Sequence, residues 1–214
     1  MSREPDEGTE RPSGPKRARR IIVCATGAYV VYSLPRVILH MLNHVADDVQ
    51  VVLSREAAKM VSRQSLQATS RNHVFVEMDE AADGVYVPHI ELARNADFIV
   101  VYPATVNILG KVANGIADDL ISAMIIAAEI PVVFVPVSNP AMLDHPAVQR
   151  NIDRLKSDGY IVLPPTLGPE VATRERMETV GGSFPMPTLL LQMNAVLADP
   201  GSPRGKARRK PPES

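Results

Sequence analysis

The chain has 214 residues, of which 45% are hydrophobic and 22% charged, and its formal net charge at pH 7 is -1. This length and composition predict one domain with a substantial core. The near-zero charge gives no global attraction to nucleic acid or to an anionic membrane, and no apolar run reaches the roughly 18 residues of a membrane span. The N-terminus lacks the apolar core of a secretion signal, so we expect a cytoplasmic protein.

Both ends of the chain have the composition of disordered tails. Residues 1–20 and 199–214 are rich in proline, glycine and charge, so we expect the folded domain to occupy residues 21–198. The clusters KRARR and RGKARRK could touch phosphates, but solvated basic flanks are the reading we favour.

Cys24, the single cysteine, lies in the apolar run IIVCAT and excludes an intrachain disulfide. We expect it to be a small buried hydrophobic residue rather than a redox or nucleophilic group. No paired cysteine and histidine spacing suggests a metal site. These features fit a reducing compartment.

Short β-branched runs alternate with helical patterns along the central part of the chain. The runs that predict strands are 21–25, 49–53, 73–77, 97–102, 131–136 and 160–163. Because these runs are apolar at nearly every position, they suit strands that are buried on both faces. The segments that predict helices are 32–45, 55–66, 108–127 and 145–157, with a short one over about 187–197. The alternation predicts an α/β fold with a doubly wound parallel sheet, a flavodoxin- or Rossmann-like three-layer sandwich with right-handed crossovers.

Residues 165–187 interrupt this alternation. Glycine and proline mark both ends of the segment, and a Gly-Gly pair stands at 181–182. Such a segment is typical of a mobile flap over a site rather than of another layer.

Small or polar residues follow the first two predicted strands. Thr26, Gly27 and Ala28 follow the first strand, and Ser54 follows the second. Exposed amides in such turns can hold a phosphate, but a plain tight turn and an ordinary helix N-cap explain the same residues. Neither G-x-G-x-x-G nor G-x-x-x-x-G-K-[ST] occurs here.

Residues 103–107, Pro-Ala-Thr-Val-Asn, follow the fourth predicted strand. Thr105 and Asn107 offer donors and acceptors that suit the polar edge of a flavin, and they suit a helix cap without a ligand equally well. His89 precedes this strand and Asn139 follows the fifth, so we expect both near one crevice. Alone, His89 would be read as a satisfied surface histidine and Asn139 as a turn residue.

Four segments together resemble one family: CATGA at 24–28, His89, PATVN with the following KVANGIADDLIS, and PVSNPAMLDHPAVQRNI. Over residues 21–163 the chain is similar to the flavin-containing cysteine decarboxylases. These include the phosphopantothenoylcysteine decarboxylases and the peptidyl-cysteine decarboxylases of lanthipeptide biosynthesis. The resemblance implies an FMN cofactor with contacts to Thr26, Gly27, Ala28, Ser54, Ala104, Thr105 and Asn107.

The resemblance also implies the catalytic and substrate-binding residues. His89 would move the proton and Asn139 would bind the substrate carboxylate, because a neutral-range base and an amide donor suit these tasks. Further substrate contacts would be Met142, Arg176 and Met177. The family motif Pro-x-Met-Asn-x-x-Met is matched except at its first methionine, which is Ser138 here.

Leu167 distinguishes two branches of this family. In phosphopantothenoylcysteine decarboxylases a flap cysteine helps to reduce the enethiol product, and here Thr166-Leu167-Gly168 stands at that place. The expected reaction is therefore oxidative decarboxylation of the C-terminal cysteine of a ribosomally synthesised precursor peptide. Its enethiol product would enter an aminovinyl-cysteine ring.

Three alternatives remain. One is phosphopantothenoylcysteine decarboxylation in coenzyme A biosynthesis, which the missing flap cysteine opposes. Another is a flavin prenyltransferase, which His89 and PVSNPAM oppose. The third is a non-catalytic FMN-binding regulatory subunit, which the presence of both His89 and Asn139 opposes. The resemblance further implies a homotrimer or homododecamer, with FMN at the contacts between subunits.

Overall fold

The computed structural model describes residues 18–164, 167–169, 178–180, 191 and 193–195. Six strands form one sheet in the order β3-β2-β1-β4-β5-β6, and every neighbouring pair is parallel. The strands are β1 (Ala18–Ala25), β2 (Ala46–Leu53), β3 (Val74–Phe75), β4 (Phe98–Ala104), β5 (Val132–Pro136) and β6 (Ile161–Val162). This order confirms the doubly wound parallel sheet, although β1 begins at Ala18 rather than at residue 21.

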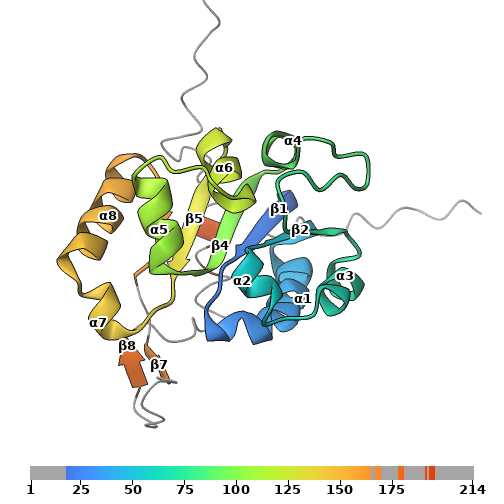
Figure 1. Ribbon diagram of the computed structural model, residues 1–214. Coiled ribbons are helices and arrows are strands. Elements are labelled where there is room, and N and C mark those ends of the chain that lie inside the picture. Colours follow the sequence, from blue (N-terminus) through green and yellow to red (C-terminus); the bar gives the residue numbers. More distant parts are fainter. Residues whose placement is uncertain (1–17, 165–166, 170–177, 181–190, 192, 196–214) are drawn as a thin grey trace, which may run out of the picture.

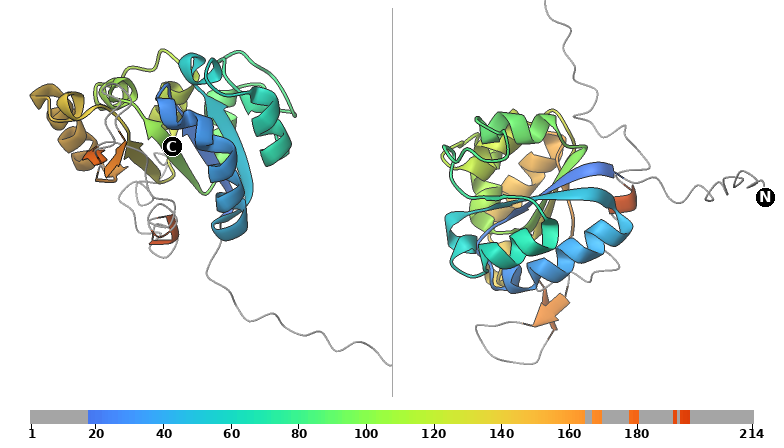
Figure 2. Two further views of the ribbon diagram at one scale, coloured as in Figure 1. Left: turned by 90° about the horizontal axis from the view of Figure 1, so that it is seen from below. Right: turned by 90° about the vertical axis from the view of Figure 1, so that its right-hand side faces the viewer.

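Helices cover both faces of the sheet (Figures 1 and 2). Ile21 and Val23 of β1 pack into one apolar layer, whereas the alternate residues Ile22 and Cys24 pack into the other. The first layer is completed by α1 (Leu34–His44), α2 (Arg55–Ala58) and α3 (Arg63–Ser70). The second is completed by α4 (Pro88–Arg94), α5 (Val106–Ala113), α6 (Leu120–Ala127) and α8 (Pro146–Ser157).

Cys24 is fully buried in β1, which confirms it as a small core residue. Burial, with a smaller contribution from the charge of Asp119, raises the pKa of its thiol above the usual range. The thiolate is therefore not formed near neutral pH, and Cys24 has no nucleophilic role.

The single helix predicted over residues 55–66 is wrong, because α2 ends at Ala58 and α3 begins only at Arg63. Ser54 caps α2 as predicted, since its side chain accepts the backbone N–H of Ala57 at 3.1 Å. Ser62 caps α3 in the same way and so starts a second helix inside the apolar pattern.

The helix predicted over residues 108–127 is also two helices, α5 and α6. Gly115, two residues after the end of α5, has a φ of +69°, a left-handed conformation that does not continue the helix. Asp119 then opens α6 through a capping box with Ser122. The predicted 32–45 helix is a 3-10 turn, η1 (Tyr29–Ser33), followed by α1, whereas 145–157 is confirmed as α8.

Two short helices were not predicted, α4 and α7 (Pro140–Leu143). Both begin with a proline, which fits the first helical position because its missing N–H has no partner there. Neither is long enough to show a helical apolar period.

Beyond β6 the structure describes a two-stranded antiparallel ribbon of β7 (Leu167–Pro169) and β8 (Glu178–Val180). Residues 18–20 of the predicted N-terminal tail belong to β1, so that boundary is wrong. The rest of both predicted tails, the rest of segment 165–187 and most of the predicted 187–197 helix lie outside the described residues, so those expectations stay predictions. Within the described part, no helix is long and apolar enough to cross a membrane.

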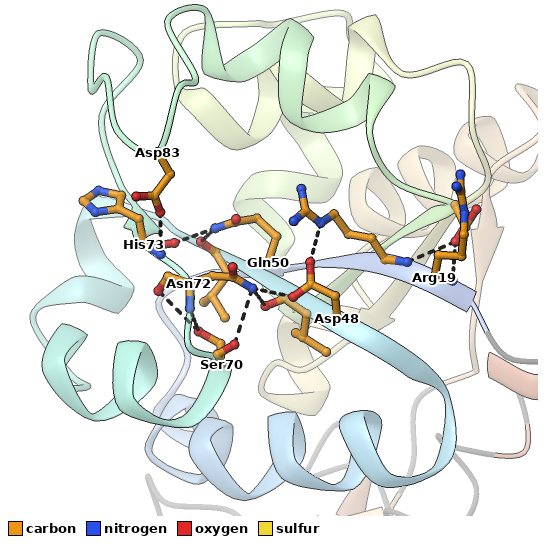
Figure 3. Close-up of polar contacts among 11 residues, drawn as sticks. Arg19, Asp48, Gln50, Ser70, Asn72, His73 and Asp83 are labelled. Carbon is orange, nitrogen blue, oxygen red and sulfur yellow. Dashed lines mark hydrogen bonds and ion pairs between the residues drawn. The ribbon is translucent and has the colours of Figure 1, made fainter.

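A polar network joins the amino ends of β1, β2 and β3 (Figure 3). Asp48 forms an ion pair with Arg20 and accepts the side-chain amide of Asn72 at 2.6 Å. Buried Gln50 donates to the backbone carbonyl of His73, which fastens β2 to the residue before β3. This network lies away from the carboxyl ends of the strands, where ligands bind in such sheets.

Candidate active site

A pocket of about 810 Å³ lies where the strands end at their carboxyl sides. Its walls are the segments that follow β1, β2, β3, β4 and β5, including the reversal of strand order between β1 and β4. The lining segments are 26–29, 53–56, 76–79, 105–108, 118–121 and 137–140, together with Lys111 and Met142. A pocket of this size falls within the range of roughly 300–1,000 Å³ that holds small molecules and cofactors.

Thr26 joins the loop after β1 to the loop after β4. Its buried hydroxyl donates to the carbonyl of Pro103 at 2.7 Å and accepts the backbone N–H of Thr105 at 3.0 Å. The two threonine Oγ1 atoms lie 3.1 Å apart. Both sides of the crevice are therefore held by one side chain.

Gly27 brings the loop after β1 against the beginning of α2. A Cβ built on Gly27 would lie 2.6 Å from the Cβ of Glu56, closer than side-chain carbons approach. Because only glycine permits this approach, the loops that carry Thr26 and Ser54 form adjoining walls of the pocket.

Thr105 and Asn107 begin α5 at the next wall. Thr105 is the N-cap residue but makes no side-chain cap hydrogen bond, since its oxygen faces that of Thr26 instead. The Asn107 side chain is exposed and lines the pocket one turn into the helix. This wall presents a hydroxyl and an amide, groups that recognise the polar edge of a flat ligand.

Asn139 lies after β5 and lines the pocket. Its Oδ1 accepts the N–H of Ala141 at 2.9 Å and caps α7, which fixes the orientation of the side-chain amide. Ser138 donates to the sulfur of Met142 at 3.4 Å, which holds this short helix against the loop. The wall therefore combines an oriented amide with an apolar thioether.

Lys111 of α5 lines the pocket and contacts two carboxylates that line it too. Its Nζ lies 2.7 Å from Asp118 and 2.6 Å from Asp119. Burial alone would lower the pKa of Lys111, but hydrogen bonds to both aspartates outweigh burial and raise it. Burial likewise opposes ionisation of Asp119, yet hydrogen bonds from Lys111 and Ser122 lower its pKa.

Arg55 and Glu77 form a bidentate ion pair between α2 and the segment after β3. The hydrogen bond from Arg55 lowers the pKa of Glu77, and the same bond raises that of Arg55. Arg55 and Lys111 are the basic side chains among the described lining residues, and both are already paired with carboxylates.

The structure brings eight of the predicted site residues together at this pocket: Thr26, Gly27, Ala28, Ser54, Thr105, Asn107, Asn139 and Met142. Ala104 is fully buried as the last residue of β4 and does not line it. Arg176 and Met177 lie outside the described residues. The roles of all these residues stay predictions.

His89, which the sequence places near the same crevice as Asn139, does not join this group. It lies at the second position of α4, which packs on α6, and is not among the residues that line the pocket. Its Nδ1 is buried without a hydrogen-bond partner among the described residues.

The sequence reasoning missed two parts of the site. One is the wall at 76–79, which was expected to continue a strand to residue 77. The other is the pair formed by Lys111 and Asp119, although the segment KVANGIADDLIS contains both. In the described residues, no group of three or more histidine, cysteine, aspartate or glutamate side chains is placed to hold a metal ion.

Comparisons with known proteins agree with this architecture. The chain is 38% identical over 150 residues to the coenzyme A biosynthesis bifunctional protein CoaBC of Bacillus subtilis, covering 70% of this chain but only 37% of that protein. It is 31% identical over 195 residues to the phosphopantothenoylcysteine decarboxylase of Mus musculus, covering 87% of this chain and 91% of the mouse protein.

Among solved structures, the FMN-dependent cysteine decarboxylase SpaF matches with a TM-score of 0.68 and 31% identity, covering 82% of this chain and 97% of SpaF. The model of the Flavoprotein family matches residues 9–187. The chain therefore belongs to the Flavoprotein family.

Proposed function

We propose that the protein is an FMN-dependent decarboxylase that acts on a cysteine with a free carboxylate. The observation that carries this proposal is the convergence of Thr26, Thr105, Asn107 and Asn139 on one pocket at the strand ends. It is supported by membership of the Flavoprotein family and by the similarity to cysteine decarboxylases.

The walls of the pocket fit FMN. Gly27 lets the loops after β1 and β2 approach each other closely at the pocket, and Thr105 and Asn107 offer polar atoms for the edge of a flat ring. We propose that these residues, with Thr26 and Ser54, hold the cofactor. Bound FMN would supply the two-electron oxidation of the cysteine side chain.

Asn139 would bind the substrate carboxylate through its amide nitrogen. The hydrogen bond from the N–H of Ala141 to Oδ1 holds the side chain in one orientation at the pocket wall. The apolar body of Met142 lies beside it and would pack against the substrate. Once the side chain is oxidised to a thioaldehyde, its position β to the carboxylate makes loss of CO2 easy, and an enethiol results.

His89 would accept a proton during oxidation, as imidazole suits this task near neutral pH. Since His89 does not line the pocket of its own chain, we propose that it enters the pocket of a second copy. The neighbouring side chains Tyr86 and Val87 are 76% and 44% exposed, which supports a contact surface next to this histidine. A homotrimer or homododecamer is the assembly that we propose.

We propose a peptide ending in cysteine as the first candidate substrate. The only cysteine of the chain is the buried Cys24, so no thiol of this chain can help to reduce an enethiol product. This feature favours a product that stays an enethiol.

Phosphopantothenoylcysteine is the second candidate substrate, and the sequence relatives favour it. The matched curated relatives are phosphopantothenoylcysteine decarboxylase and CoaBC, and the match to the mouse enzyme extends along almost its whole length. The chain spans little more than a third of CoaBC, so only a decarboxylase activity is proposed from that relative.

Mass spectrometry of the products distinguishes the two candidates. The purified protein with FMN would be incubated with a peptide ending in cysteine and, separately, with phosphopantothenoylcysteine. Oxidative decarboxylation lowers the substrate mass by about 46 Da, that of CO2 and two hydrogens, whereas redox-neutral decarboxylation lowers it by about 44 Da. If neither substrate changes mass while FMN is bound, the enzymatic proposal is wrong and a binding role replaces it.

A further inference from the structure

The wall of the pocket at residues 76–79 is held by a side chain that lies outside the pocket. β3 has only two residues, so the backbone leaves the sheet after Phe75. The next two amides, of Val76 and Glu77, donate to one oxygen of Glu80 at 2.8 and 3.3 Å. The Glu80 carboxylate therefore accepts the hydrogen bonds of two amides that have left the sheet and have no strand carbonyl as acceptor.

The second oxygen of Glu80 connects this wall to the body of the domain. It accepts the guanidinium of Arg63, from α3, and lies 2.8 Å from Nε2 of His73. Arg63 also donates to the carbonyl of Val74 in β3 at 2.6 Å. Glu80 therefore fastens the wall to both a helix and the edge strand.

The Glu80 carboxylate is charged at neutral pH. Its side chain is 19% exposed. Burial alone would raise its pKa, but the bonds from the amides of Val76 and Glu77 and from Arg63 and His73 lower it to about 2. The two backbone amides and the Arg63 guanidinium donate to this carboxylate, and Nε2 of His73 lies within hydrogen-bonding distance, an arrangement that suits an ionised acid because it only accepts.

The wall that Glu80 fixes carries groups that face the ligand space. Val76, Glu77, Met78 and Asp79 all line the pocket, whereas Glu80 does not. Glu77 then reaches Arg55, at the start of α2, through three hydrogen bonds. Moving this segment would therefore change the shape of the pocket and break its ion pair.

We propose that Glu80 is a positioning residue for the ligand of this pocket: it sets the place of residues 76–79 without touching the ligand. This inference rests on the proposed function in that the ligand used to test it is FMN. The carboxamide of Glu80→Gln keeps the size of the side chain but turns one acceptor into a donor. It therefore cannot accept bonds from all four partners.

The test compares two variants of the full chain, Glu80→Gln and Asp48→Asn. The control loses the Arg20 ion pair of the network at the amino ends of the strands, which does not line the pocket (Figure 3). Two quantities are measured for each: the dissociation constant of FMN, from flavin fluorescence, and the hydrogen-exchange rates of the Val76 and Glu77 amides without FMN. Thermal unfolding of the apoprotein reports the general loss of stability.

We expect Glu80→Gln to raise the FMN dissociation constant at least about fivefold and to speed exchange of both amides by a similar factor. Asp48→Asn should lower the unfolding temperature yet leave both quantities within about twofold of the unmodified chain. If the FMN dissociation constant of Glu80→Gln stays within twofold of that of the unmodified chain, the inference is wrong.

Failure of the proposed function gives a different result. If the unmodified chain binds no FMN, the proposed cofactor is wrong, and the exchange rates then decide the role of Glu80. Unchanged exchange of the Val76 and Glu77 amides in Glu80→Gln overturns that role, and faster exchange supports it.

Discussion

Thr26 accepts the backbone N–H of Thr105 at 3.0 Å while donating to the carbonyl of Pro103 at 2.7 Å. One buried hydroxyl therefore satisfies a donor and an acceptor of the loop after β4. Since β1 and β4 flank the reversal of strand order, this contact fixes the distance between the two central walls of the pocket.

Replacing Thr26 by valine should lower the free energy of unfolding by about 1–3 kcal/mol, because the N–H of Thr105 loses its side-chain acceptor and the carbonyl of Pro103 loses the hydroxyl while it keeps the backbone N–H of Thr26. Urea denaturation measures this loss. The matched control is Thr69→Val in α3, whose exposed hydroxyl bonds only the carbonyl of Ser65 in its own helix. A loss for Thr26→Val no larger than for the control would show that the contact is dispensable.

Gly27→Ala should destabilise the fold by about 1–3 kcal/mol, since the new methyl group would meet the Cβ of Glu56 at 2.6 Å. Gly110→Ala is the control: its methyl group finds only the side-chain amide of Asn151, at 3.5 Å, and alanine suits the helix better. Thermal unfolding of both variants measures the difference. Equal unfolding temperatures would mean that the loops after β1 and β2 do not adjoin closely.

The contribution of Glu80 to stability should depend on pH. Its pKa is about 2 in the folded protein, below the ordinary 4.5, so the stabilisation is present above pH 4.5 and is lost as the pH falls toward 2. We expect Glu80→Gln to lower the unfolding free energy by about 1–2 kcal/mol at pH 7, a value reduced by solvent screening. Urea denaturation at pH 7, 4 and 3 should show this gap narrowing. A gap that stays constant over this range would contradict the assigned ionisation.

Asn139→Asp separates the cap of α7 from binding of the substrate. The carboxylate still accepts the N–H of Ala141, so the unfolding temperature should change little. Turnover should fall at least about 100-fold, because the amide donor is replaced by a charge that repels the substrate carboxylate. Product formation, followed by mass spectrometry, measures the loss. Near-normal turnover would remove Asn139 from carboxylate binding.

The strands were predictable because parallel strands buried on both faces leave continuous apolar runs, as in β1 and β4. The division of α5 from α6 was missed, although the sequence carries signals for it: Gly115 between the two helices and the capping pair of Asp119 and Ser122 at the start of α6.

The walls of the site were predictable where a polar residue directly follows a strand, as Ser54 and Thr105 do. The place of His89 was not, because a residue close to a strand in sequence can lie on a helix that faces another surface. Glu80 gave no local signal either, since its partners Arg63 and His73 come together only in the folded chain.

The most direct test of the proposed chemistry is a reaction without oxygen. The FMN-loaded protein would be mixed with excess peptide ending in cysteine, while flavin absorbance and released CO2 are recorded together. Oxidative decarboxylation predicts that the oxidised-flavin band bleaches with about one CO2 released per flavin, and that the reaction then stops until oxygen is admitted. Continued CO2 release with the band unchanged, or no release at all, would contradict the account.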